Sequence, residues 1–235
     1  DVEVRGRHAD AYLGLAEAAA QHLNTGRQPP WLDRLARDDA NLRSALRWSI
    51  ASGDVDRAFR LFGAQWRYWL LTGQLAQGAV WSEAVFAMPG SDRPTVARAG
   101  ALSAAGGIAY WRADAEASGR FYEAQLEVAR LVDDGPGMAD AYFNLAAAAF
   151  VSGETSLAVE RLREARRRFL ELGDDVGVNR ADWSFSNLTI ATEGPAAAMS
   201  EIQRTFERAE ALGDVQYIAM AAGSLALTSH MLGDF

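Results

Sequence analysis

Three aspartates at a constant spacing form the pattern that could most readily carry chemistry. Asp134, Asp174 and Asp214 lie 40 positions apart, and each one closes a helix-like stretch. Carboxylates that gather in space can bind a metal ion or act as general acid and base. Glycine precedes two of them, however, and a glycine followed by an aspartate is a common way to end one helix and begin the next. We therefore interpret the three aspartates as caps of a repeating unit.

The remaining candidates for catalysis or metal binding have simpler structural explanations. His8, His22 and His230 are widely separated and lack the spacing of metal ligands. The chain has no cysteine, which excludes thiolate catalysis, disulfides and cysteine-ligated zinc. A phosphate loop of the G-x-x-x-x-G-K-[S/T] type is absent, and Gly106 and Gly107 fall inside an expected helix, where close packing explains them. We expect no catalytic residue, metal site or cofactor.

The charge of the chain bears on its partners. The 235 residues carry a formal net charge of −8, which argues against direct binding of nucleic acid. The basic triplet at residues 166–168 lies among glutamates, so we interpret it as a solvated helix face. No apolar run approaches the roughly 18 residues that cross a bilayer. We expect a cytoplasmic fragment of a longer protein that contacts neither nucleic acid nor membrane.

Apolar residues recur at intervals of three and four along almost the whole chain, which indicates helices and no other element. Glycine- and proline-containing stretches such as "TGRQPP", "PGSDRP" and "DDGPG" separate them. The expected helices cover about 4–24, 30–51, 55–71, 75–88, 93–111, 115–132, 137–151, 155–172, 176–192, 195–212 and 215–232.

An internal repeat of about 40 residues organises these helices. Three columns of the aligned repeat contain only small side chains: Gly106, Ala146, Ser186 and Ala226; Ala109, Ala149, Thr189 and Ser229; and Ser118, Ala158 and Ala198. Small residues at fixed points allow two helices of a hairpin to approach closely. The sequence therefore predicts an all-α fold, a right-handed superhelix of stacked antiparallel helix hairpins.

The repeat register also predicts the domain organisation. Residues 1–53 do not fit the register and form a helical lead-in, while residues 54–235 hold the hairpin repeats, the last of them truncated. The aromatic cluster of Trp66, Tyr68, Trp69 and Trp81 lies on two neighbouring helices of this region. We interpret it as core, with a ligand pocket as the alternative.

The hairpins resemble the tetratricopeptide repeat. Its signature residues are matched in one unit by Tyr142, Leu145, Ala146, Ala149, Gly153, Ala158, Leu162 and Ala165. The period is longer than is usual in that family, and no proline closes the second helix. HEAT-like repeats have a closer period, but their typical first-helix proline is missing.

A second resemblance covers residues 1 to about 90. The stretches "RGRHADAYLGLAEAAAQHL", "WLDRLARDDANLRSALRWSIASGD" and "AFRLFGAQWRYWLLTGQLAQGAVWSEAVFAMPG" are similar to the linker and first helices of bacterial signal-transduction ATPases, the LuxR-type and AfsR-type transcriptional regulators. In that family the segment follows an ATPase and a winged helix. The resemblance implies upstream ATPase and DNA-binding domains in the same chain, controlled by a sensor arm.

The first helix of each hairpin would line the concave face of such a superhelix. Arg180, Trp183 and Asn187 share a helix face by their spacing, and they combine a cation, an aromatic ring and an amide. We expect this face to bind a peptide, a protein partner or a small-molecule effector. The full set of predicted binding residues is Tyr110, Phe143, Asn144, Phe150, Arg180, Trp183 and Asn187.

Three functions remain open at this point. The first is a non-enzymatic sensor and interaction module that controls the upstream ATPase. The second is a constitutive scaffold for partner docking or homo-oligomerisation. The third, an unrelated helical enzyme, lacks a catalytic constellation in the sequence.

Overall fold

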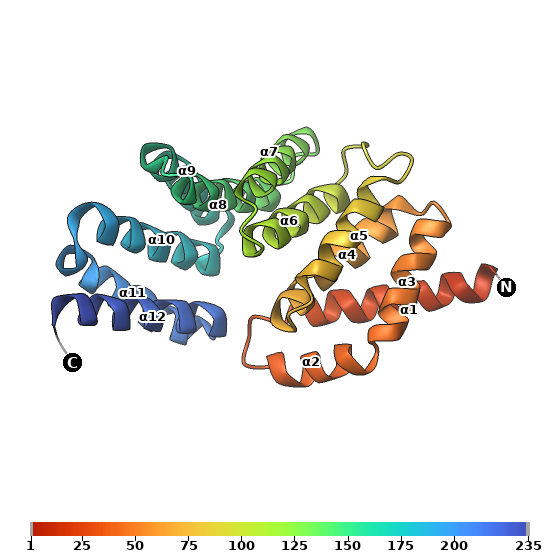
Figure 1. Cartoon of the computed structure of the whole chain (residues 1–235), viewed down its shortest axis with the longest axis horizontal. Helices are drawn as coiled ribbons and strands as arrows, with labels where there is room; N and C mark the ends of the chain where they lie inside the picture. The colour runs from red at the N-terminus through yellow and green to blue at the C-terminus, as the bar shows by residue number, and fades with distance from the viewer. Residues whose placement is uncertain (1, 234–235) are drawn as a thin grey trace. The chain divides into compact units, whose positions relative to one another are not determined.

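The computed structural model describes residues 2–233 of the chain. In this part of the chain twelve α-helices follow one another, and the only β-pairing is an isolated bridge between Thr25 and Asp214. Figure 1 labels the helices in chain order. Their bounds are α1 Val2–Ala20, α2 Gln28–Arg37, α3 Asp39–Ala51, α4 Val55–Leu71, α5 Leu75–Phe86, α6 Val96–Trp111, α7 Ala115–Leu131, α8 Gly135–Val151, α9 Thr155–Leu172, α10 Asp175–Glu193, α11 Pro195–Leu212 and α12 Val215–Leu232.

The predicted fold class is confirmed. From α4 onward the helices form hairpins with short connections, as expected for an all-α superhelical repeat. Across residues 2–233, no helix has the length and apolar character needed to cross a membrane.

The helices pack into two compact units. The first unit comprises residues up to Leu23 together with Arg27–Gly137, and the second comprises Asn24–Gly26 and the residues from Met138 onward. This division follows packing and not the repeat register. The predicted boundary between a lead-in at 1–53 and repeats at 54–235, whose last two residues lie outside the described part, stays a prediction.

One expected helix, at 30–51, is in fact two. The backbone leaves helical geometry at Asp38, with φ −99° and ψ 8°, and α3 starts directly after it. The Asp38 carboxylate accepts hydrogen bonds from the Tyr12 hydroxyl at 3.1 Å and from the Asn41 amide at 3.2 Å. Asp38 thus joins the turn to α1, a tertiary contact that hydrophobic periodicity does not reveal.

The recurring aspartates are helix caps, as predicted. Asp134, Asp174 and Asp214 accept hydrogen bonds from backbone N–H groups three residues later, at 3.0, 2.9 and 3.2 Å. Gly173 and Gly213 end the preceding helices with φ of 68° and 69°, in the left-handed region that favours glycine. Each carboxylate therefore caps the first turn of the helix that follows it, and the three do not form one acidic site.

The first small column meets the second helix of its hairpin at Gly106, as predicted. Gly106 on α6 is covered by the Tyr122 ring of α7, and a Cβ at Gly106 would lie 2.4 Å from that ring. In the next hairpin the same two positions hold Ala146 and Leu162, both buried. In both hairpins a small residue of the first helix thus corresponds to a large residue of the second helix.

The aromatic cluster is core. Tyr68 and Trp69 are almost fully buried, and Trp66 and Trp81 pack against the same core from its edge. The Trp66 ring lies on Gly107, where a Cβ would approach it to 2.9 Å. Each of the two adjacent glycines of α6 thus packs against one aromatic ring.

The connectors provide a test of backbone strain. Ala113 occupies the connector position that holds Gly73 and Gly153 in the flanking hairpins, and it has a φ of 61°. A left-handed backbone costs a non-glycine residue about 1–2 kcal/mol, while glycine loses roughly 0.5–1 kcal/mol more entropy on folding. We expect Ala113→Gly to raise the free energy of unfolding by up to about 1 kcal/mol. Urea denaturation measures the change, and Gly153→Ala should shift it in the opposite direction. A lower free energy of unfolding for Ala113→Gly would contradict the claim that the backbone at Ala113 is strained.

The contact between Gly106 and Tyr122 provides a second test. Gly106→Ala forces a methyl group into the Tyr122 ring, and overpacking of this kind costs about 1–3 kcal/mol. Gly100 on the same helix has open space around its Cβ position, so Gly100→Ala should stabilise by roughly 0.5–1 kcal/mol. Adding Tyr122→Leu to Gly106→Ala reproduces the Ala146 and Leu162 pair and should recover part of the loss. Thermal unfolding of the unchanged chain, the two alanine variants and the double variant measures these differences. Equal unfolding temperatures of Gly106→Ala and Gly100→Ala would contradict the prediction.

Candidate functional site

The predicted residues of α10 come together with side chains of two neighbouring first helices. Arg180 contacts residues of α8 and α12, and Trp183 and Asn187 contact residues of α12. Figure 1 shows α12 beside α10 within the second unit. We call this set the α8–α10–α12 surface; it consists of Asp140, Phe143, Asn144, Arg180, Trp183, Asn187, Tyr217 and Ser224.

Arg180 is the centre of this surface. Its guanidinium carbon lies 4.5 Å from the centroid of the Phe143 ring and 5.9 Å from that of Tyr217. One guanidinium nitrogen contacts the Asp140 carboxylate at 3.2 Å. The Arg180 side chain is 19% exposed and Asp140 is 43% exposed, so the pair reaches solvent on the Asp140 side. The Arg180 guanidinium of α10 therefore contacts both α8 and α12 and links the three helices.

The residues around Arg180 stabilise its charged form. Burial disfavours the charged form, but the interactions with Tyr217 and Asp140 outweigh it and raise the pKa of Arg180 above its ordinary value. The guanidinium thus remains a permanent cation at this position.

Trp183 and Asn187 are linked through a serine of α12. The Trp183 indole N–H donates to the Ser224 hydroxyl at 3.2 Å, and this hydroxyl donates to the Asn187 amide oxygen at 3.1 Å. The Asn187 amide nitrogen donates to the backbone carbonyl of Trp183 at 2.8 Å. The Trp183 ring meets the Tyr217 ring edge to face, with centroids 5.5 Å apart. This network fixes the orientation of a half-buried aromatic ring and a half-buried amide.

The other predicted residues divide into two groups. Phe143 is buried below Arg180, and Asn144 lies half-buried on the same helix. Phe150 is 39% exposed near the end of α8. Tyr110 belongs to α6 of the first unit, where it packs edge to face on Trp111 at 5.8 Å. The structure therefore joins Phe143 to Arg180 and Trp183 to Asn187 directly, and Tyr217 links the two pairs. Phe150 and Tyr110 have other surroundings.

Sequence reasoning missed Asp140, Tyr217 and Ser224. Asp140 and Arg180 are 40 positions apart, so they occupy the same column of the repeat in successive units. Opposite charges in one column of stacked helices are expected to pair, and this signal was present in the sequence. Tyr217 and Ser224 gave no comparable signal, because their contacts with α10 depend on how α12 packs.

The opposite flank of α10 carries a second charged junction. Asp182 accepts from Arg166 of α9 at 2.5 Å and from Arg208 of α11 at 2.9 Å. The other arginines of the basic triplet at 166–168 pair with glutamates of their own helix, and hydrogen bonds from Arg167 and Arg168 lower the pKa of Glu164. The triplet is therefore neutralised by carboxylates of the chain and does not present a phosphate site.

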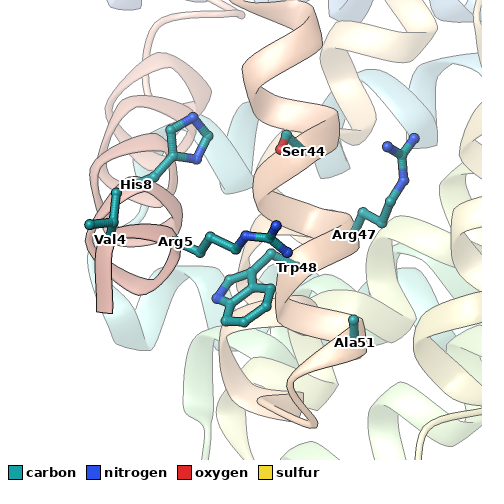
Figure 2. Close-up of a pocket in the computed structure, with 7 residues that line it drawn as sticks. All are labelled: Val4, Arg5, His8, Ser44, Arg47, Trp48 and Ala51. Atoms are coloured by element: carbon teal, nitrogen blue, oxygen red, sulfur yellow. The ribbon is translucent and has the colours of Figure 1, made fainter. Parts of the chain in front are cut away.

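Two hollows lie in the first unit, and the sequence indicated neither. One, of about 470 Å³, lies between α1 and α3 and is drawn in Figure 2. The other, of about 730 Å³, lies between α1, α4 and α6, where Gly63 of α4 lies against the backbone of Gly100 of α6. The ion pair of Glu17 and Arg60 forms its polar wall. Both hollows depend on the packing of α1, a helix outside the repeat register.

A metal centre is not indicated by the described side chains. In residues 2–233, no three histidines, aspartates or glutamates gather as ligands of one ion.

Comparisons with known proteins identify a similar fold and give no function. Neither the protein-family models nor the curated proteins contain a match to this chain. Among solved structures, the chain is similar to the crystal structure of BtubC (BKLC) from P. vanneervenii, with a TM-score of 0.51 and 15% sequence identity. The alignment covers 100% of this chain and 85% of that one. At this identity the likeness shows a shared helical fold alone.

The packing of Arg180 can be tested by a change that keeps the charge. Arg180→Lys removes the planar guanidinium from Phe143 and Tyr217, and we expect a loss of about 1–2 kcal/mol in the free energy of unfolding. Arg163 is exposed on α9, so Arg163→Lys should change it by less than about 0.5 kcal/mol. Chemical denaturation followed by circular dichroism compares the two. Equal effects would show that Arg180 contributes only its charge.

Proposed function

We propose that this chain is a non-enzymatic sensor and interaction module that binds a peptide or a small ligand on its α8–α10–α12 surface. The observation that carries the proposal is the convergence of Arg180, Trp183 and Asn187 with residues of α8 and α12. Repeat proteins of stacked hairpins commonly bind extended partners along such a row of first helices.

The chemistry of the surface suits a ligand with amide groups and a carboxylate. Trp183 supplies an aromatic face, and the amides of Asn144 and Asn187 can exchange hydrogen bonds with a peptide backbone. Arg180 is paired with Asp140, whose carboxylate is 43% exposed. A ligand carboxylate would bind by replacing Asp140 as the partner of Arg180, and a bidentate contact would favour that exchange.

Replacement of Asp140 also gives binding a structural consequence. The pair of Asp140 and Arg180 connects α8 to α10, so a ligand that separates them changes the contact between two hairpins. A ligand shifts a conformational equilibrium only when it binds the two states with different affinity. The exchange of carboxylates supplies that difference.

The proposed biological setting is a bacterial transcriptional regulator. The similarity of residues 1 to about 90 to the linker of LuxR-type and AfsR-type signal-transduction ATPases supports this setting. In such a protein the repeat region would act as the sensor arm for an ATPase of the same chain.

A thermal-shift screen of peptides and metabolites against the chain tests the proposal. A ligand at about 100 times its dissociation constant stabilises by about 2.7 kcal/mol, which corresponds to a rise in Tm of about 5–10 °C for a chain of this size. We expect Trp183→Ala to abolish the shift and Trp183→Phe to retain part of it. Arg163→Gln serves as the control and should leave the shift unchanged.

Two outcomes would contradict the sensing function. One is a stabilising ligand whose effect survives both Trp183→Ala and Asn187→Ala, since it would bind elsewhere. The other is an absence of any hit together with self-association that increases with protein concentration, measured by sedimentation. That second outcome favours the alternative of a constitutive scaffold.

A further inference from the structure

The hollow between α1 and α3 is separate from the α8–α10–α12 surface. It has a volume of about 470 Å³, within the range of roughly 300–1,000 Å³ that ligand pockets usually occupy. Figure 2 shows its side chains on two facing helices. The described lining residues are Val4, Arg5 and His8 from α1 and Ser44, Arg47, Trp48 and Ala51 from α3.

The hollow is lined by positively charged side chains, whereas the chain as a whole is negatively charged. Arg5 and Arg47 line it, and none of its described lining residues is a carboxylate, although the chain has a net charge of −8. Carboxylates are present on α1 and α3, but Glu3, Asp10 and Asp39 pair with Arg7, Arg57 and Arg43. Among the described residues, Arg5 and Arg47 have no ion pair. Two cations thus line a hollow whose neighbouring anions are engaged elsewhere.

Two side chains of the hollow, those of Arg5 and His8, are held in place by neighbouring residues. The Arg5 guanidinium carbon lies 5.3 Å from the centroid of the Trp48 ring, a cation–π contact that reduces the freedom of the side chain. His8 lies 3.4 Å from the Asn41 amide oxygen through its Nε2, which fixes the ring. Ser44, Arg47 and Trp48 share one face of α3 by their spacing. In Figure 2 Arg5 extends from α1 toward Trp48, whereas Arg47 projects from the side of α3 that faces away from α1.

We propose that the hollow between α1 and α3 binds a phosphomonoester carried on an aromatic ring. A phosphomonoester has a charge of about −1.5 to −2 at neutral pH, which the Arg5 guanidinium and that of Arg47, turned toward the hollow by rotation of its exposed side chain, can balance. The Ser44 hydroxyl adds a donor for a third oxygen. Val4, Trp48 and Ala51 offer apolar surface to the ring. A carboxylate would use fewer of these donors, so the phosphoryl group is the better fit.

Phenyl phosphate is the probe, compared with inorganic phosphate and phenol by isothermal titration calorimetry on the whole chain. We expect saturable binding of phenyl phosphate that is at least about tenfold tighter than that of inorganic phosphate or phenol, because it engages both the arginines and Trp48. Titration should also shift the indole N–H signal of Trp48 in the NMR spectrum. Trp183→Ala should leave this binding unchanged, which separates the site from the proposed sensing function.

Exposed arginines allow matched variants with little risk to folding. Arg5→Gln and Arg47→Gln should each weaken phenyl phosphate about tenfold, and Arg163→Gln, which changes the net charge equally, should not. The proposal is overturned if phenyl phosphate shows no saturable binding at millimolar concentration. It is also overturned if Arg163→Gln weakens binding as much as Arg47→Gln, since attraction would then follow net charge alone.

Discussion

The close approach of two helices within each hairpin is the constraint on which the rest of the structure depends. Where α6 meets α7, Gly106 leaves space that only the Tyr122 ring fills. The next hairpin solves the same problem with Ala146 and Leu162. Because one hairpin cannot cover its own apolar face, each must be stacked on a neighbour, and the stacking brings the first helices into one row. The candidate surface exists because of that row.

Helix α10 shows how such a row distributes charge. Its one flank holds Asp182 between Arg166 and Arg208, and its other flank holds Arg180 between Asp140 and the aromatic rings. The first arrangement joins α10 to the second helices α9 and α11, and the second joins it to the first helices α8 and α12. Both are partly open to solvent, since the Arg166 and Arg208 side chains are 40% and 46% exposed and that of Asp140 is 43% exposed.

The sequence predicted most of the features that repeat and missed those that do not. The caps at Asp174 and Asp214 and the small columns recur at a fixed period, so a local rule was enough to identify them. The break at Asp38 depends on the hydroxyl of Tyr12, 26 positions away, and no periodic signal reports such a contact. The hollow between Arg5 and Trp48 was missed for the same reason, since α1 and α3 lie outside the register. Arg180 was named from the sequence as a binding residue, which stays a prediction, and its pairing with Asp140 was overlooked.

The pairing of Asp140 with Arg180 makes the charge pattern of the surface depend on the position of Arg180 along α10. One residue added to or removed from α10 ahead of Arg180 would turn Arg180 by about 100° around the axis of that helix. The guanidinium would then leave the Asp140 carboxylate and the rings of Phe143 and Tyr217 together. The number of residues between the cap of α10 and Arg180 therefore keeps a cation in phase with its counterion 40 residues away. In this chain a change in the length of that first stretch of α10 is also a change in the ion pairing between two hairpins.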